Sequence, residues 1–296
     1  MKLLITGATG FIGKELVKKF DLENITIFSR KTNSNINTIN CSLEDLLVKK
    51  CITEQYDVAI HLAGLAHNNY SLDQLRKINV ESTLALARQL VLKGLKRFVF
   101  VSSIGVNGNK TIDSAFNEES IPNPHADYAI SKCEAEFELT KLTKELDFEL
   151  VIIRPPLVYG KSAPGNFKRL YSLVSKGVPL PFGLANNSRS FISVSNLCDF
   201  IALTVVHPKA ADELFLVCDD DNVSTKSLVK LIWKEKNINS FLIPVPVFMF
   251  KFLFELLGLS SMAIQLFDNL EVDNSKAKNL LGWHPNQSMI DVFKKM

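Results

Sequence analysis

Three glycines stand at intervals of three residues near the start of the chain, in the segment TGATGFIG. Gly7, Gly10 and Gly13 follow a short apolar run, Leu3–Thr6, and lead into a helical apolar pattern over residues 11–20. Glycine permits a positive φ and a close approach of the backbone to a ligand, and a helix N-terminus offers free N–H groups to an anion. A strand that turns into a helix through such a loop is typical of a dinucleotide site. We therefore expect a pyrophosphate site here, in preference to a tight turn that binds nothing.

Short apolar runs alternate with longer helical patterns through the first half of the chain. Further strands are expected at Ile25–Ser29 and at residues 58–63, 98–103 and 150–154, with helices over 72–93 and 128–146. Strands that are apolar throughout are typical of a parallel sheet covered on both faces. The pattern predicts an α/β fold of the Rossmann type, with a doubly wound parallel sheet.

The alternation ends after Pro155 and Pro156, and Gly and Pro become frequent between residues 160 and 183. Residues 191–194, a helix from Asn196 and residues 214–218 are interpreted as returns to the sheet. We therefore predict a dinucleotide-binding domain over residues 1–155, with returns at about 191–218. A smaller, interleaved α/β lobe over residues 156–296 would bind the substrate. The Asn-rich segment 33–40 is expected to form a loop.

Charge and cysteine content bear on the partners, metal sites and cellular location that this chain can have. The 296 residues carry a net charge of +3 without a basic run, which does not favour a nucleic-acid partner but suits a small anionic substrate. The five cysteines show neither metal-ligand nor redox spacing, so we expect no metal site, reduced thiols and a cytoplasmic protein. The N-terminal segment lacks the long apolar core of a signal peptide.

Residues 245–259, VPVFMFKFLFELLGL, form a strongly apolar stretch interrupted by Lys251 and Glu255. The stretch is too short to span a bilayer, so no stable membrane insertion is expected. We prefer a core or lid helix here to a helix that docks on a membrane surface.

The end of the second expected strand bears on the choice of cofactor. An NAD site favours a carboxylate there, to accept a hydrogen bond from the ribose 2′-hydroxyl. This chain has Ser29 and Arg30 instead, followed by Lys31. A guanidinium suits the 2′-phosphate of NADP, whereas Ser29 could hold the ribose of NAD. NADP is therefore favoured over NAD, and the alternative is a solvated basic pair on the surface.

Tyr128 and Lys132, in YAISK, are spaced to lie one helical turn apart on the same face. A nearby ammonium favours the phenolate of a tyrosine, whose ordinary pKa is about 10. This spacing alone is common on surface helices. Ser103 strengthens the interpretation because it ends the strand over residues 98–103, and active sites gather at the carboxyl ends of such strands. We take Ser103, rather than its neighbour Ser102, as the hydroxyl that places a substrate beside Tyr128.

In combination, these residues resemble the extended short-chain dehydrogenase/reductases, in particular the NAD-dependent epimerase/dehydratase family acting on nucleotide sugars. The resemblance covers nearly the whole chain. It is carried by TGATGFIG, HLAG, INVESTLALA, RFVFVSS, YAISK, RPPLVYG, RSFISVSNL and DNSKAKNLLGWHP.

The resemblance, together with the glycine loop and the end of the second strand, implies site residues throughout the chain. The catalytic residues would be Ser103, Tyr128 and Lys132. The substrate would meet Ser103 and, at its diphosphate, Asn166 and Arg189. The cofactor would contact Gly7, Thr9, Gly10, Phe11, Ile12, Gly13, Ser29, Arg30, Leu62, Ala63, Gly64, Asn79, Tyr128, Lys132 and Pro155.

Two departures from the family pattern carry information. Ile104 and Gly105 follow Ser103 where the dehydratases have an Asp–Glu pair, so dehydration is not expected. Asn107 stands where epimerases commonly have Tyr. The resemblance is greatest to bacterial reductases and epimerases acting at C4 of UDP-N-acetylhexosamines for surface polysaccharide, such as the 4-reductase that makes UDP-N-acetylquinovosamine.

Three functions follow as hypotheses. The first is reduction of a UDP-linked 4-keto-6-deoxy-N-acetylhexosamine, which Arg30 favours because a reductase consumes free NADPH. The second is a UDP-glucose or UDP-N-acetylglucosamine 4-epimerase with bound NAD. The third, a non-catalytic cofactor-sensing protein, is disfavoured because Ser103, Tyr128 and Lys132 are all present. The resemblance also implies a homodimer through the helices over 72–93 and 128–146.

Overall fold

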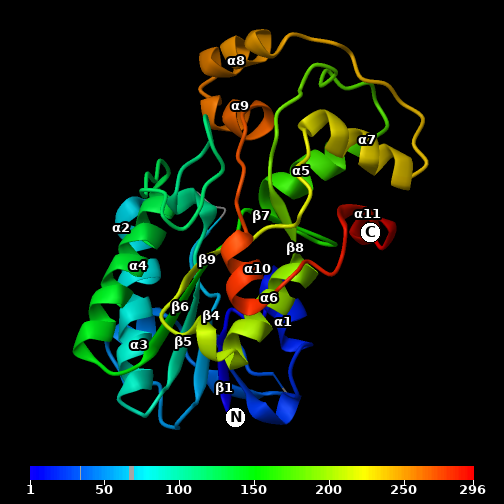
Figure 1. Ribbon diagram of the computed structural model, residues 1–296. Helices are drawn as coiled ribbons and strands as arrows, with labels where there is room; N and C mark the ends of the chain where they lie inside the picture. Colours follow the sequence, from blue (N-terminus) through cyan, green and yellow to red (C-terminus); the bar gives the residue numbers. More distant parts are fainter. Residues whose placement is uncertain (34, 67–69) are drawn as a thin grey trace.

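The computed structural model describes residues 1–33, 35–66 and 70–296 (Figure 1). Its centre is a sheet of seven strands, in which all neighbouring strands run parallel. The strand order across the sheet is β3 (Asn37–Asn40), β2 (Ile25–Ser29), β1 (Leu3–Thr6), β4 (Val58–His61), β5 (Arg97–Val101), β6 (Glu149–Arg154) and β9 (Leu214–Leu216). The order reverses beside β1, as in a doubly wound sheet. The predicted Rossmann-type fold is confirmed.

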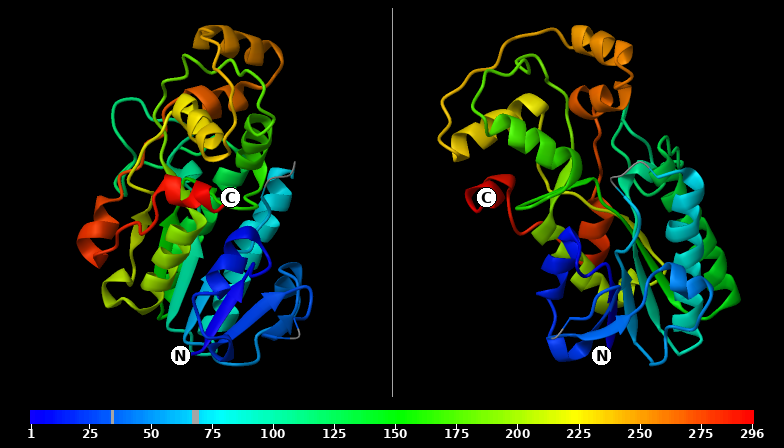
Figure 2. Two further views of the ribbon diagram at one scale, coloured as in Figure 1. Left: turned by 90° about the vertical axis from the view of Figure 1, so that its right-hand side faces the viewer. Right: turned by 180° about the vertical axis from the view of Figure 1, so that it is seen from behind.

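Helices cover both faces of this sheet (Figure 2). One face carries α1 (Phe11–Val17), α6 (Val194–Val206) and α10 (Ser275–Leu281), and the other carries α2 (Leu72–Leu75), α3 (Ser82–Val91) and α4 (Asp127–Glu145). A π-helical segment, Arg76–Glu81, joins α2 to α3, so the expected helix over 72–93 is present with a π-helical middle. Side chains along β1 alternate between the two cores: Leu3 and Ile5 face one, and Leu4 faces the other.

A second lobe lies at the carboxyl ends of the strands (Figure 1). It contains a two-stranded parallel sheet of β7 (Leu157–Tyr159) and β8 (Phe191–Ser193). Its helices are α5 (Gly165–Val174), α7 (Thr225–Glu235), α8 (Val247–Leu256), α9 (Ser260–Phe267) and α11 (Met289–Lys294). Short 3-10 turns complete the described structure at Leu22–Asn24, Glu44–Leu47, Ile104–Val106 and Pro208–Ala210.

Two sequence expectations about strands are wrong. Residues 191–194 do not return to the main sheet, because β8 pairs with β7, while β9 occupies the edge of β6. The Asn-rich segment 33–40 is not all loop, because β3 occupies its last four residues and pairs with β2. An edge strand needs only partial burial, so its polar composition concealed it. The domain division at residue 155 stays a prediction.

The sequence predicted a core or lid helix over residues 245–259, and the core alternative is wrong. Helix α8 contains no buried residue, and several of its large apolar side chains are mostly exposed, with Phe248 at 71% and Phe252 at 64%. Its inner side contacts the lobe through Val247, Phe250 and Phe254, and Lys251 forms an ion pair with Asp268.

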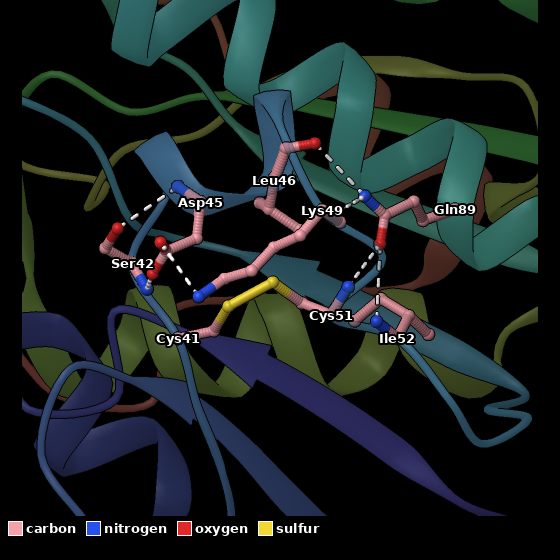
Figure 3. The surroundings of a disulfide bond; sticks show 8 residues. All are labelled: Cys41, Ser42, Asp45, Leu46, Lys49, Cys51, Ile52 and Gln89. Carbon is pink, nitrogen blue, oxygen red and sulfur yellow. Dashed lines mark hydrogen bonds and ion pairs between the residues drawn. A yellow bond between two sulfur atoms is a disulfide. The ribbon is translucent and has the colours of Figure 1, made fainter.

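The sequence predicted that all cysteines are reduced thiols. This is wrong for one pair, because Cys41 and Cys51 form a disulfide (Figure 3). The chain between them turns back through a short helix. Gln89 of α3 holds the returning segment by accepting from the backbone N–H groups of Cys51 and Ile52, at 2.9 and 3.3 Å. The pair is ten residues apart, a spacing without a redox signature. The cytoplasmic prediction rested partly on reduced thiols and loses that support.

Candidate active site

The turn between β1 and α1 needs its glycines for steric reasons. Gly7 has a φ of +71°, and a Cβ there would lie 2.8 Å from the backbone nitrogen of Ala63. A Cβ on Gly13 would lie only 2.2 Å from the carbonyl oxygen of Gly7. Thr9 and Gly10 are exposed at the tip of the turn. A bare backbone at the start of a helix fits the predicted pyrophosphate.

A buried polar chain fixes the neighbouring strand end. The Thr6 hydroxyl lies 2.8 Å from Nδ1 of His61, and Nε2 of His61 lies 3.0 Å from the Thr83 hydroxyl. Thr6 also accepts from the backbone N–H of Ala63 at 3.1 Å. Burial lowers the pKa of His61 to about 3, so the ring is neutral. Sequence reasoning quoted His61 only within the HLAG motif and missed its positioning role.

Ser29 and Arg30 lie at the carboxyl end of β2, on the strand next to β1. The Ser29 hydroxyl accepts from the backbone N–H of Lys31 at 3.2 Å. The Arg30 side chain is exposed and makes no hydrogen bond or ion pair to the described residues. The position predicted to select the cofactor is thus an accessible cation.

Ser103 and Tyr128 line one cavity of about 730 Å³. Ser103 caps the turn after β5, and its hydroxyl accepts from the backbone N–H of Gly105 at 3.1 Å. Tyr128 stands in the first turn of α4, and burial raises its pKa to about 12. The phenol therefore keeps its proton at neutral pH in the free protein, which is the form a proton donor needs.

Lys132 lies one turn beyond Tyr128 and is 3% exposed. Its Nζ donates to the Val101 carbonyl at 2.9 Å and lies 4.4 Å from the centre of the Phe100 ring. Burial lowers its pKa to about 8, although the charge of Glu136 opposes this. This buried ammonium is held against the end of β5, one helical turn from Tyr128 on the same face of α4.

Asn79 joins the π-helical segment to two other parts of the site. Its side chain accepts from the Leu65 N–H at 2.8 Å and donates to the Leu65 carbonyl at 3.1 Å. It also donates to the Ser131 hydroxyl of α4 at 3.0 Å. A Cβ on Gly64 would lie 2.9 Å from Asn79 Oδ1, so this loop must pass close to the side chain. π-Helical turns are frequent at functional sites, and here one places Asn79.

Asn107 replaces the tyrosine of the family pattern for a visible reason. It is buried, and its Oδ1 accepts from Nη1 of Arg154 at 3.0 Å. Arg154 also forms an ion pair with Glu136, at 2.5 Å between Nη2 and Oε2, with both side chains less than a tenth exposed. The amide thus completes a buried polar cluster behind α4.

Asn166 and Arg189 line the far end of the cavity. Arg189 donates from Nη1 to the carbonyls of Ile264 and Asp268, at 3.3 and 2.9 Å, and burial lowers its pKa to about 10. The described residues give it no ion pair. Asn166 donates to Gln265 of α9. No sequence motif indicated that α9 would form this wall.

The cavity is therefore lined by residues that the sequence predicted for catalysis, for cofactor binding and for substrate binding. Those that line it are Phe11, Ile12, Leu62, Ser103, Tyr128, Lys132, Pro155, Asn166 and Arg189. The other predicted site residues lie outside its lining: Gly7, Thr9, Gly10, Gly13, Ser29, Arg30, Ala63, Gly64 and Asn79. Within the described ranges, no cluster of three His, Cys, Asp or Glu side chains is placed to hold a metal.

Comparisons with known proteins agree with this geometry. A family described as "NAD dependent epimerase/dehydratase family" matches residues 3–218. A UDP-glucose 4-epimerase of Vibrio cholerae is 38% identical, over 99% of this chain and 93% of its own length. In fold, the chain is similar to the UDP-glucose 4-epimerase of Thermotoga maritima with UDP-glucose, with a TM-score of 0.80, 22% identity and coverage of 99% and 96%.

A UDP-glucuronic acid 4-epimerase from Bacillus cereus in complex with NAD gives a TM-score of 0.78 at 21% identity, covering 99% of this chain and 96% of that one. The prediction of an NAD(P)-dependent nucleotide-sugar enzyme is confirmed at this level. From the family match over most of its length and the relative at 38% identity, we conclude that the chain belongs to the NAD dependent epimerase/dehydratase family.

Proposed function

We propose that this chain uses NADPH to reduce the 4-keto group of a UDP-linked 6-deoxy-N-acetylhexosamine, giving UDP-N-acetylquinovosamine. The observation that carries the reductase proposal is Arg30, an exposed cation at the end of β2 that pairs with none of the described residues, where no carboxylate follows the strand to bind a free ribose 2′-hydroxyl. A guanidinium there favours the 2′-phosphate of NADPH, the cofactor consumed in reductions.

The chain's own groups would handle the proton. A nicotinamide cofactor held by these residues would supply the hydride for C4 of the sugar. Tyr128 donates its phenolic proton to the C4 oxygen as the carbonyl becomes an alcohol, and Ser103 hydrogen-bonds the same oxygen. Lys132 stabilises the tyrosinate that results, and solvent then returns the proton.

The far end of the cavity would hold the nucleotide diphosphate. Arg189 and Asn166 line the cavity from the second lobe, Tyr128 lines it from α4, and most of the cavity wall is apolar. A guanidinium is a suitable donor to a phosphate, and Nη1 is already fixed by two carbonyls. This arrangement supports a sugar bound beside Ser103 and Tyr128.

Arg30 gives the direct test of the cofactor assignment. In the variant Arg30→Gln, the KM for NADPH should rise about tenfold or more, while the KM for NADH changes little. Lys31→Gln is the matched control, because it removes the adjacent exposed charge. Equal effects of both variants on the two cofactors would reject the 2′-phosphate contact.

A second candidate function is 4-epimerisation with retained NAD, favoured by the 38% identity to the Vibrio cholerae UDP-glucose 4-epimerase. The same residues would act in this reaction. Tyr128 would remove the C4 hydroxyl proton during oxidation and return it after the keto sugar has rotated in the site. Catalytic amounts of enzyme that interconvert UDP-N-acetylglucosamine and UDP-N-acetylgalactosamine without added cofactor would select this function. Stoichiometric NADPH oxidation with the UDP-4-keto-6-deoxy sugar would select the reductase.

We also propose a homodimer through α3 and α4. Leu92, next to α3, and Phe137 of α4 are exposed at 77% and 61%, and ion pairs such as Arg88–Glu145 hold the two helices together. Sedimentation equilibrium of the wild-type chain and of Phe137→Asn tests this arrangement. A cytoplasmic location stays a prediction.

A further inference from the structure

Helix α8 is apolar on both sides, but only one side is used by the fold. Val247, Phe250 and Phe254 face inward, and the Phe250 ring lies 5.1 Å from that of Phe267. The outward face comprises Phe248, Met249, Phe252, Leu253 and Leu256, continued by Leu257 and Leu259, all between 39% and 71% exposed. Lys251 and Glu255 are the only charged residues of α8, and a helix that is otherwise apolar normally lies in a core or in a membrane.

The exposed apolar side chains are concentrated in one region. Residues 173–184 and 241–259 hold twelve of the twenty-one exposed large apolar side chains in the described part of the chain. The two segments are adjacent, because Leu180 and Leu242 form a β-bridge and the Gly183 N–H donates to the Ile243 carbonyl at 3.0 Å. Such a concentration marks an interaction surface.

The helices α5 and α7 of the same lobe carry charges of one predominant sign, whereas α8 itself carries Glu255 and Lys251, which pairs with Asp268. Segments 165–176 and 225–236, which contain α5 and α7, carry seven Lys and Arg and a single acid, Glu235, while the whole chain has a net charge of only +3. Both helices lie at the same end of the molecule as α8 (Figures 1 and 2). Lys168, Lys230 and Lys234 are exposed there.

We infer that the outward face of α8 docks on the surface of an anionic phospholipid bilayer. An apolar helix face on a lobe that carries an excess of cations is complementary to hydrocarbon bordered by anionic headgroups. The ten residues of α8 span about 15 Å, too little to cross a bilayer, and no helix among the described residues is long and apolar enough to do so. The helix therefore lies in the plane of the membrane surface.

Docking would hold the cavity close to the membrane. Helix α9 follows α8 directly and packs against it, and Ser261, Met262 and Gln265 of α9 line the cavity. The inference does not depend on which sugar or cofactor the site takes.

Vesicle flotation of the full chain tests the proposal. The wild type should float with vesicles rich in phosphatidylglycerol and much less with phosphatidylcholine alone. Phe252→Asn with Leu256→Asn should lower the bound fraction about tenfold or more, because both side chains are exposed and their loss leaves the fold intact. The matched control is Val48→Asn with Ile121→Asn, two residues of greater exposure that lie outside both α8 and the proposed dimer surface, which should bind like the wild type.

A further variant, Lys230→Gln with Lys234→Gln, should weaken binding to the anionic vesicles only. Circular dichroism and thermal melting confirm that each variant is folded. Absence of wild-type binding to the anionic vesicles, or equal binding by the α8 variant, would overturn the proposal. It would also be overturned if the α8 substitutions changed the oligomeric state in sedimentation equilibrium, because the face would then be covered by a second copy of the chain.

Discussion

Replacement of Lys132 by Met should stabilise the folded protein while abolishing its activity. The ammonium is 3% exposed, and burial lowers its pKa from 10.5 to about 8. At about 1.4 kcal/mol per pKa unit, keeping the charged group inside the fold costs about 3 kcal/mol near pH 7. Met fills a similar volume without that charge.

The net gain is smaller than the full electrostatic cost. The substitution also removes the hydrogen bond from Nζ to the Val101 carbonyl, which contributes about 1 kcal/mol. We therefore expect Lys132→Met to raise the free energy of unfolding by about 2 kcal/mol near pH 7.

The gain should depend on pH in a defined direction. Below about pH 8 both the folded and the unfolded wild type hold the proton, so the cost of the buried charge is complete. Between about pH 8 and 10.5 the unfolded chain keeps a proton that the folded chain has lost, so wild-type stability rises with pH. At about pH 10 the remaining cost is about 1 kcal/mol, and the advantage of Lys132→Met should nearly vanish.

Urea denaturation near pH 7 and near pH 10, without cofactor, measures the gain in the free energy of unfolding and its dependence on pH. Lys141→Met is the control, since Lys141 lies on the same helix with half of its side chain exposed and should change stability by less than about 0.5 kcal/mol. The reasoning is refuted if Lys132→Met is less stable than the wild type near pH 7, or if the difference does not change with pH.

Three further predictions concern the fold around the site. Gly13→Ala should lower the free energy of unfolding by about 2 kcal/mol and weaken NADH binding measured by fluorescence, because its Cβ would lie 2.2 Å from a backbone oxygen. Glu136→Ala should cost about 3–5 kcal/mol by leaving the buried Arg154 charge unpaired, whereas replacing both partners with apolar residues should cost much less in the same urea titration. Reduction of the Cys41–Cys51 disulfide should cost about 2–3 kcal/mol, and thiol titration of the denatured, unreduced protein should find three thiols rather than five.

Local signals were sufficient for much of the fold. Apolar runs buried on both faces indicated the parallel sheet, and the spaced glycines indicated the turn between β1 and α1. The spacing of Tyr128 and Lys132 predicted that they lie together, because an α-helix places residues four apart on one face. Motifs of this kind depend on contacts between residues that are close in sequence.

Features that depend on distant parts of the chain could not be read in this way. Nothing in the sequence near β8 says that it pairs with β7 rather than with the main sheet. The polar segment that contains β3 looked like a loop because an edge strand needs little apolar burial. The Cys41–Cys51 pairing depends on how α3 holds the returning segment through Gln89.

The sequence by itself determined the nucleotide-binding fold, the glycine turn and the residues proposed for proton transfer, because each is encoded by a short pattern with a local physical cause. Only the tertiary structure decided that Lys132 is buried against Val101, and that Asn166 and Arg189 share one cavity with Tyr128. It also decided that the outward face of α8 stays exposed. Burial and shared cavities depend on how distant segments pack, and no local pattern specifies that packing.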